Sequence, residues 1–177
     1  MLVENVKSIF SSWSPGTLSA AGINFKETSD PTFHPNDDYR VIYEASFEPS
    51  VLDKARIEFW VTDTGLVAIG IETYERIIKR TGLIAFRGGF ALGHEPRSVS
   101  EKALQILFDV LSQGRLTISV YSFLRTITST ELFLKASDCQ VLTEGGYKPK
   151  WISSMANKAN SSLIYSDTML MYRPWAD

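Results

Sequence analysis

The strongest pattern in the chain is a two-residue alternation of apolar and polar side chains. Large apolar side chains stand at every second position over residues 39–47, and polar side chains stand between most of them. Such alternation is typical of a strand with one buried face. Residues 57–62 and 66–71 continue the β pattern on either side of a turn that contains Gly65. A glycine can supply the positive φ of a tight reversal, so these two segments are predicted to form a β-hairpin.

Two stretches instead carry apolar side chains at the three- and four-residue spacing of an amphipathic helix. They are residues 1–13 and residues 98–113. Ser98 and Glu101 have the spacing of a capping box, which predicts that the second helix begins there. Gly114 follows where a helix commonly ends in a left-handed residue.

Alternation returns three more times, at residues 116–124, 132–136 and 162–172. Residues 72–81 are ambiguous, since they fit either a short helix that ends at Gly82 or a continuation of the preceding strand. Successive strands are linked as in hairpins rather than by long crossovers. The pattern therefore predicts a single α+β domain spanning residues 1–177, with a mainly antiparallel sheet and helices packed on one face.

Composition agrees with a folded unit and excludes several partners. The 177 residues are 44% apolar and 21% charged, and 18 basic against 20 acidic side chains give a formal net charge of −2. A nucleic-acid binder normally shows a basic excess, which is missing here. A lone cysteine, Cys139, cannot form an intrachain disulfide, and no signal peptide or membrane-spanning run is recognisable. We therefore expect a soluble, cytoplasmic protein without nucleic-acid or membrane partners.

Sequence motifs of known catalytic chemistry are absent. Asp63, Thr64 and Gly65 match the aspartic-protease tripeptide, but that chemistry needs two carboxylates, and one copy in a hairpin is explained by turn preference. There is no serine-hydrolase elbow, phosphate-binding loop, zinc-protease helix or pair of CxxC motifs. The only histidines, His34 and His94, are far apart along the chain. We expect no catalytic residue, metal or cofactor, and a protein that acts by binding.

One glycine-rich segment, residues 87–97, combines side chains that suit an anionic ligand. Arg87 and Arg97 could hold a phosphate or carboxylate, and His94 or Glu95 could move a proton. The segment also precedes the N-terminus of a predicted helix, where anions are favoured. A small-molecule binding protein or an enzyme is thus one alternative, and a solvated connecting loop is another.

The strands themselves offer a second candidate surface. Glu44 and Glu58 fall on the outward side of neighbouring strands, and Trp60 shares that side. An aromatic side chain within an acidic face has the composition of a protein-binding hot spot, although a helix could cover it instead. These three residues predict a protein-binding module with a basic partner. One form of such a module is an immunity-type protein that neutralises a cognate toxin by covering its active site.

Overall fold

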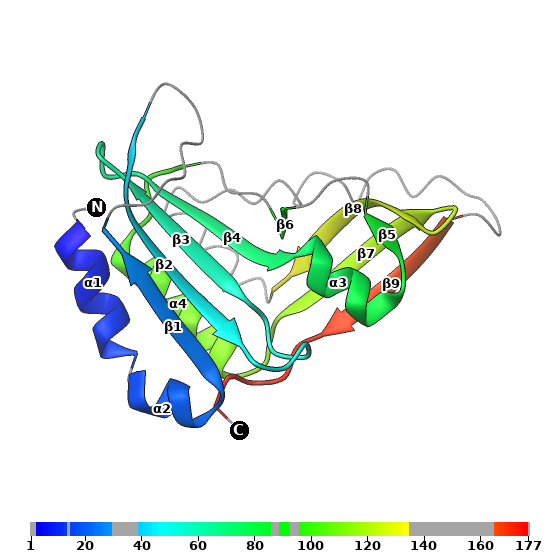
Figure 1. The fold of residues 1–177 in the computed structure, drawn as a ribbon, viewed down its shortest axis with the longest axis horizontal. Helices are drawn as coiled ribbons and strands as arrows, with labels where there is room; N and C mark the ends of the chain where they lie inside the picture. The colour runs from blue at the N-terminus through cyan, green and yellow to red at the C-terminus, as the bar shows by residue number, and fades with distance from the viewer. Residues whose placement is uncertain are drawn as a thin grey trace.

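Two β-sheets form the framework of the protein (Figure 1). The computed structural model describes residues 3–13, 15–29, 39–85, 89–92, 96–134 and 165–176. Within these ranges, strands and helices combine as the predicted α+β class requires, and nearly all strand pairs are antiparallel. No helix in these ranges has the length and apolar character needed to cross a membrane.

The larger sheet has five antiparallel strands in the order β1-β2-β3-β4-β6. Their bounds are β1 Ile23–Thr28, β2 Val41–Pro49, β3 Ile57–Thr62, β4 Val67–Thr73 and β6 Phe90–Leu92. The hairpin of β3 and β4 is confirmed, since Ile57 pairs with Ile71 and Gly65 has a φ of 78°. β1 was not predicted, because its apolar and polar side chains alternate over too few positions to stand out.

A β-bulge in β2 changes which side chains reach the core. Val41 pairs with Thr62, but Tyr43 pairs with Val61, so one extra residue lies between them. Such an insertion reverses the face on which the preceding residues lie. Tyr43 belongs to the main core, whereas Val41 packs with Trp60 on the opposite face. The prediction of one continuous apolar face over residues 39–47 is therefore wrong at Val41.

The smaller sheet has the order β5-β8-β7-β9, so β9 lies at one edge (Figure 1). Its strands are β5 Ile84–Ala85, β7 Thr117–Phe123, β8 Thr126–Phe133 and β9 Tyr165–Met171. β7 and β9 confirm two of the predicted strands, while β8 begins earlier than expected. β5 and β8 run parallel, and the other pairs in this sheet are antiparallel.

The helices are α1 Val3–Ser12, α2 Pro15–Ala20, α3 Tyr74–Thr81 and α4 Glu101–Ser112. α1 and α4 confirm the two predicted helices, and α3 resolves the ambiguous segment as a helix closed by left-handed Gly82. The predicted cap of α4 is wrong. Ser100, not Ser98, caps the helix, and its hydroxyl accepts the amide of Ala103 at 3.1 Å.

Aromatic side chains dominate the core on one face of the larger sheet, where α1 flanks β1 and α4 lies behind the strands in the view of Figure 1. The Phe10 ring lies 4.8 Å from that of Phe59, and the Phe47 ring lies 5.3 Å from that of Trp175. Trp175 is fully buried and donates its indole N–H to the carbonyl oxygen of Ala55 at 2.9 Å. This bond fixes the end of the chain against the larger sheet.

Candidate functional site

Two glutamates share the face of the larger sheet that lies opposite the main core. Glu44 pairs with Trp60 and Ser46 pairs with Glu58, so Glu44 and Glu58 are diagonal neighbours on β2 and β3. Glu58 is only 7% exposed, whereas Glu44 is half-buried and reaches the surface. The structure thus brings together the two acidic residues that the sequence placed on one outward face.

The surroundings of Glu58 change its pKa. Burial, followed by a hydrogen bond with Glu44, raises the pKa of Glu58 to about 7, although Arg56 acts in the opposite direction. A carboxylate beside a second carboxylate loses its proton reluctantly, because both charges cannot be accommodated at low cost. Near neutral pH the Glu58 carboxyl group is therefore protonated for a substantial fraction of the time.

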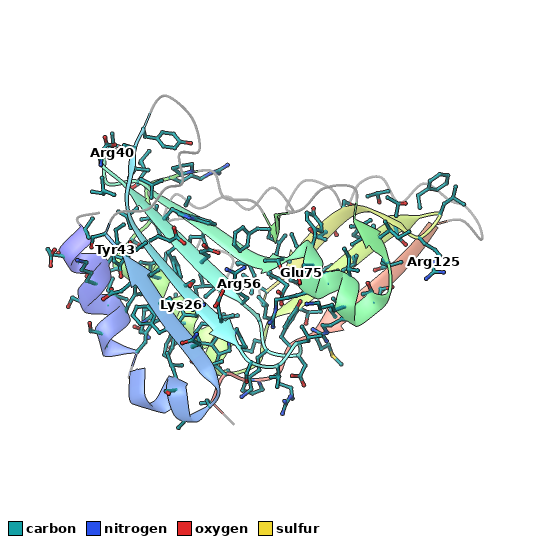
Figure 2. The ribbon with its side chains drawn as sticks, in the orientation of Figure 1. Lys26, Arg40, Tyr43, Arg56, Glu75 and Arg125 are labelled. Carbon is teal, nitrogen blue, oxygen red and sulfur yellow. The ribbon has the colours of Figure 1, made fainter. Side chains whose placement is uncertain are left out.

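Arg56 connects this pair to a wider ionic network. Its Nη2 lies 3.0 Å from Glu58 Oε2 and 3.0 Å from Glu48 Oε1. Glu48 also receives Lys26 Nζ at 2.6 Å, and this bond is the main reason that the pKa of Glu48 is lowered. Figure 2 labels Lys26 on β1 and Arg56 just before β3. Two cations thus contact Glu48, and one of them, Arg56, also contacts Glu58.

Trp60 does not present an exposed hot spot. It is only 4% exposed and forms a small second cluster with Val41, Ala68 and Phe90. The Phe90 ring meets Trp60 edge-on at 5.1 Å, and the Arg56 guanidinium lies 5.3 Å from the same ring. The expectation that Trp60 contacts a partner directly is therefore corrected: Trp60 lies beside the acidic pair on the same sheet face, where Phe90 and Val41 pack against it.

Gly70 explains how Phe90 comes so close to the sheet. A Cβ atom at Gly70 would lie 2.7 Å from the Phe90 ring, which is closer than real contacts allow. The absence of a side chain at this strand position therefore lets the ring lie directly on β4. Phe90 in turn gives Arg56 an aromatic surface that holds its guanidinium near Glu58.

The candidate anion-binding segment is described only in part. Arg87, His94 and Glu95 lie outside the described residues, so their predicted role stays a prediction. Arg97 is half-buried, and its backbone forms two hydrogen bonds with Val67, at 2.8 and 3.0 Å. These bonds tie the end of the segment to the start of β4.

A buried acidic residue that sequence reasoning missed lies at the end of β4. Glu72 is fully buried and has a left-handed backbone with φ of 58°. Its Oε1 accepts Arg76 Nε at 2.7 Å and the amide of Thr73 at 3.0 Å. Burial raises the pKa of Glu72, and the nearby Arg76 charge lowers it. The sequence signal that could have identified this ion pair is an acidic residue four positions before an arginine, but that spacing does not show whether the pair is buried.

Arg76 and Tyr172 complete this buried junction between the sheets. Arg76 donates to the carbonyl oxygens of Pro49, Val51 and Lys54, at 2.7 to 3.2 Å. Burial and then the Glu72 charge raise the pKa of the Tyr172 hydroxyl, although Glu72 Oε2 and this hydroxyl form no hydrogen bond of good geometry. Glu72 and Tyr172 are buried and Arg76 is only slightly exposed, as expected of a structural junction.

Comparisons with known proteins do not assign this site. No family model, curated protein or solved structure matches the chain. Among the residues placed by the structure, no three histidine, cysteine or acidic side chains are arranged to hold a metal ion.

Proposed function

We propose that the chain is a protein-binding module that receives a basic side chain of its partner at the Glu44–Glu58 pair. The observation that carries the proposal is the placement of two like-charged side chains as diagonal neighbours on one sheet face. Two carboxyl groups held this close can both ionise only at a cost in stability, and we therefore expect the arrangement to serve binding rather than fold stabilisation.

A lysine or arginine from the partner would remove that cost. The cation would lie against Glu44, which reaches the surface, and would favour ionisation of Glu58 beneath it. Trp60 and Phe90 form an apolar surface beside the carboxyl groups, where a charge pair is screened less by solvent. A toxin with a basic active site is one partner of this chemistry, and the chain would then act as an immunity-type protein.

Affinity capture tests the proposal with matched variants. The tagged protein is incubated with lysate of its native host at low and at high salt, and the retained proteins are identified by mass spectrometry. We expect one near-stoichiometric basic protein with the unmodified chain, and its loss with the double variant Glu44→Gln/Glu58→Gln. Glu75→Gln is the control, because Glu75 is an exposed carboxylate on α3 that pairs with Lys79. Equal capture by all three proteins would contradict the proposal.

A further inference from the structure

The Glu58 carboxyl group is surrounded by more acidic than basic side chains. Within the described part of the chain, its one ion pair is with Arg56 Nη2 at 3.0 Å, and the same nitrogen lies 3.0 Å from Glu48 Oε1. Glu44 is its diagonal neighbour on β2. Because Glu58 is only 7% exposed, water solvates its charge poorly. A negative charge at Glu58 is thus stabilised mainly by an arginine that it shares.

The direct neighbours of Glu58 in the sheet bring no charge to it. Its register partners are Ser46 on β2 and Gly70 on β4, and Gly70 has no side chain. The Phe90 ring of β6 fills the space above Gly70, where it lies 2.7 Å from the position that a Cβ atom would take. A hydroxyl group and an aromatic ring lower the polarity around the carboxyl group without neutralising it.

Two further cations lie near this network, and each forms an ion pair with a carboxylate other than Glu58. Lys26 Nζ on β1 lies 2.6 Å from Glu48 Oε2. Arg76 Nε on α3 lies 2.7 Å from Glu72 Oε1, and the Arg76 charge also acts on Glu48. An incoming cation would therefore add a stabilising charge that the described residues give to Glu58 only in part.

We propose that the partner's cation replaces a proton on Glu58, so that acid weakens the association. This proton exchange rests on the proposed function, because it concerns the same pair of glutamates and the same cation. In the free chain, the proton neutralises Glu58 for part of the time. In the complex, the proton has passed to the solvent and the ammonium or guanidinium group of the partner supplies the positive charge instead. One positive charge leaves the site as another enters it.

The direction of the pH effect follows from the two forms of Glu58. Burial, followed by the hydrogen bond with Glu44, raises its pKa to about 7, so both forms are populated near neutral pH. A cation placed beside the pair favours the ionised form and lowers that pKa. If binding lowers the pKa by about one to two units, the affinity for the cation rises about five- to tenfold between pH 6 and pH 8.

Calorimetric titration with an octalysine peptide tests the proton exchange. The ends of the peptide are blocked and its side chains stay charged between pH 6 and pH 8, so the peptide itself does not titrate. We expect the unmodified chain to bind it about five- to tenfold more tightly at pH 8 than at pH 6. At pH 7, titrations in two buffers of different ionisation enthalpy should show the release of about half a proton for each peptide bound.

Matched variants separate the proton exchange from the proposed function. Glu58→Gln should bind the peptide more weakly at pH 8 and equally at both pH values, whereas Glu75→Gln, at an exposed carboxylate paired with Lys79, should behave as the unmodified chain does. Equal binding by the unmodified chain at both pH values, or a pH dependence that Glu58→Gln retains, would overturn the proton exchange alone. No binding at pH 8, or undiminished binding by Glu44→Gln/Glu58→Gln, would overturn the proposed function and the proton exchange with it.

Discussion

Glu44 and Glu58 lie diagonally across β2 and β3, and the burial of Glu58 beside Glu44 raises its pKa to about 7. Arg56 forms ion pairs with both Glu58 and Glu48, so its single positive charge is shared between two carboxyl groups. Near neutral pH, Glu58 is therefore partly protonated and its remaining charge is shared with Arg56. This relationship connects the geometry of the sheet to the proposed binding of a basic partner.

Glu58→Gln should change how stability depends on pH. The pKa of Glu58 is raised from an ordinary value of 4.5 to about 7 in the folded state, so its stabilising contribution is present below pH 4.5 and is lost as pH rises through 7. Glutamine does not titrate, so the variant should not lose this stability as pH rises. At pH 8 its free energy of unfolding should exceed that of the unmodified chain by about 1 kcal/mol, a figure that allows for the lost ion pair with Arg56. Urea unfolding at pH 5 and pH 8 measures the difference. Parallel pH profiles for the two proteins would show that Glu58 titrates normally.

Trp60→Ala should act mainly by lowering the free energy of unfolding, not by removing a contact with the partner. Trp60 is almost fully buried against Phe90 and Val41, so truncation leaves a cavity and should cost about 3–5 kcal/mol of unfolding free energy. Trp60→Phe should cost less, since it retains an aromatic ring. Denaturant unfolding checks both variants. If Trp60→Ala left stability unchanged and abolished capture of the partner, Trp60 would be a direct contact after all.

Glu72→Ala should be among the most destabilising single substitutions in the sheet. It leaves Arg76 without its buried carboxylate, and breaking a buried pair in this way typically costs about 3–5 kcal/mol. Glu72→Gln keeps a side-chain oxygen for Arg76 and the Thr73 amide, so it should cost less. Thermal unfolding of the two variants gives the order. Equal stability of Glu72→Ala and the unmodified chain would contradict a structural role for the pair.

Leu124→Asn should stabilise the β7–β8 hairpin. Leu124 and Arg125 have φ values of 47° and 65°, the left-handed conformation that a two-residue turn of this type requires. Asparagine adopts it more readily than leucine, and Leu124 is 67% exposed, so little packing is lost. We expect a gain of about 0.5–1 kcal/mol in urea unfolding. Arg125, labelled at the tip of the hairpin in Figure 2, is kept because it donates to the carbonyl oxygen of Gly82. A loss of stability would show that the Leu124 side chain has a packing role.

Local patterns predicted those parts of the fold that depend on near neighbours in the sequence. The turn at Gly65 and the end of α3 at Gly82 follow from backbone conformations that glycine adopts easily. The cap of α4 was misplaced because two serines stand two residues apart, and either can accept an amide hydrogen bond. Which serine does so depends on where the chain leaves its bridge to β4, at Arg97, which is bound to Val67.

The candidate site was predictable only as a set of residue types on one face. Alternation placed Glu44, Glu58 and Trp60 together, and the register of β2 and β3 confirms that they share a face. The burial of Trp60 could not be predicted, because it depends on Phe90, which arrives from a distant strand, and on the bulge that turns Val41 toward it. Side chains brought together by tertiary packing leave no periodic signal in the sequence.

The most direct test of the central claim is a carboxyl NMR titration of Glu58 in the unmodified chain and in Glu44→Gln. The account predicts a pKa near 7 for Glu58 and a clear decrease once Glu44 no longer carries a charge, with Glu75→Gln as a control that leaves it unchanged. A Glu58 pKa at the ordinary value of 4.5, or one that Glu44→Gln does not alter, would contradict the coupled acidic pair on which the proposed function depends.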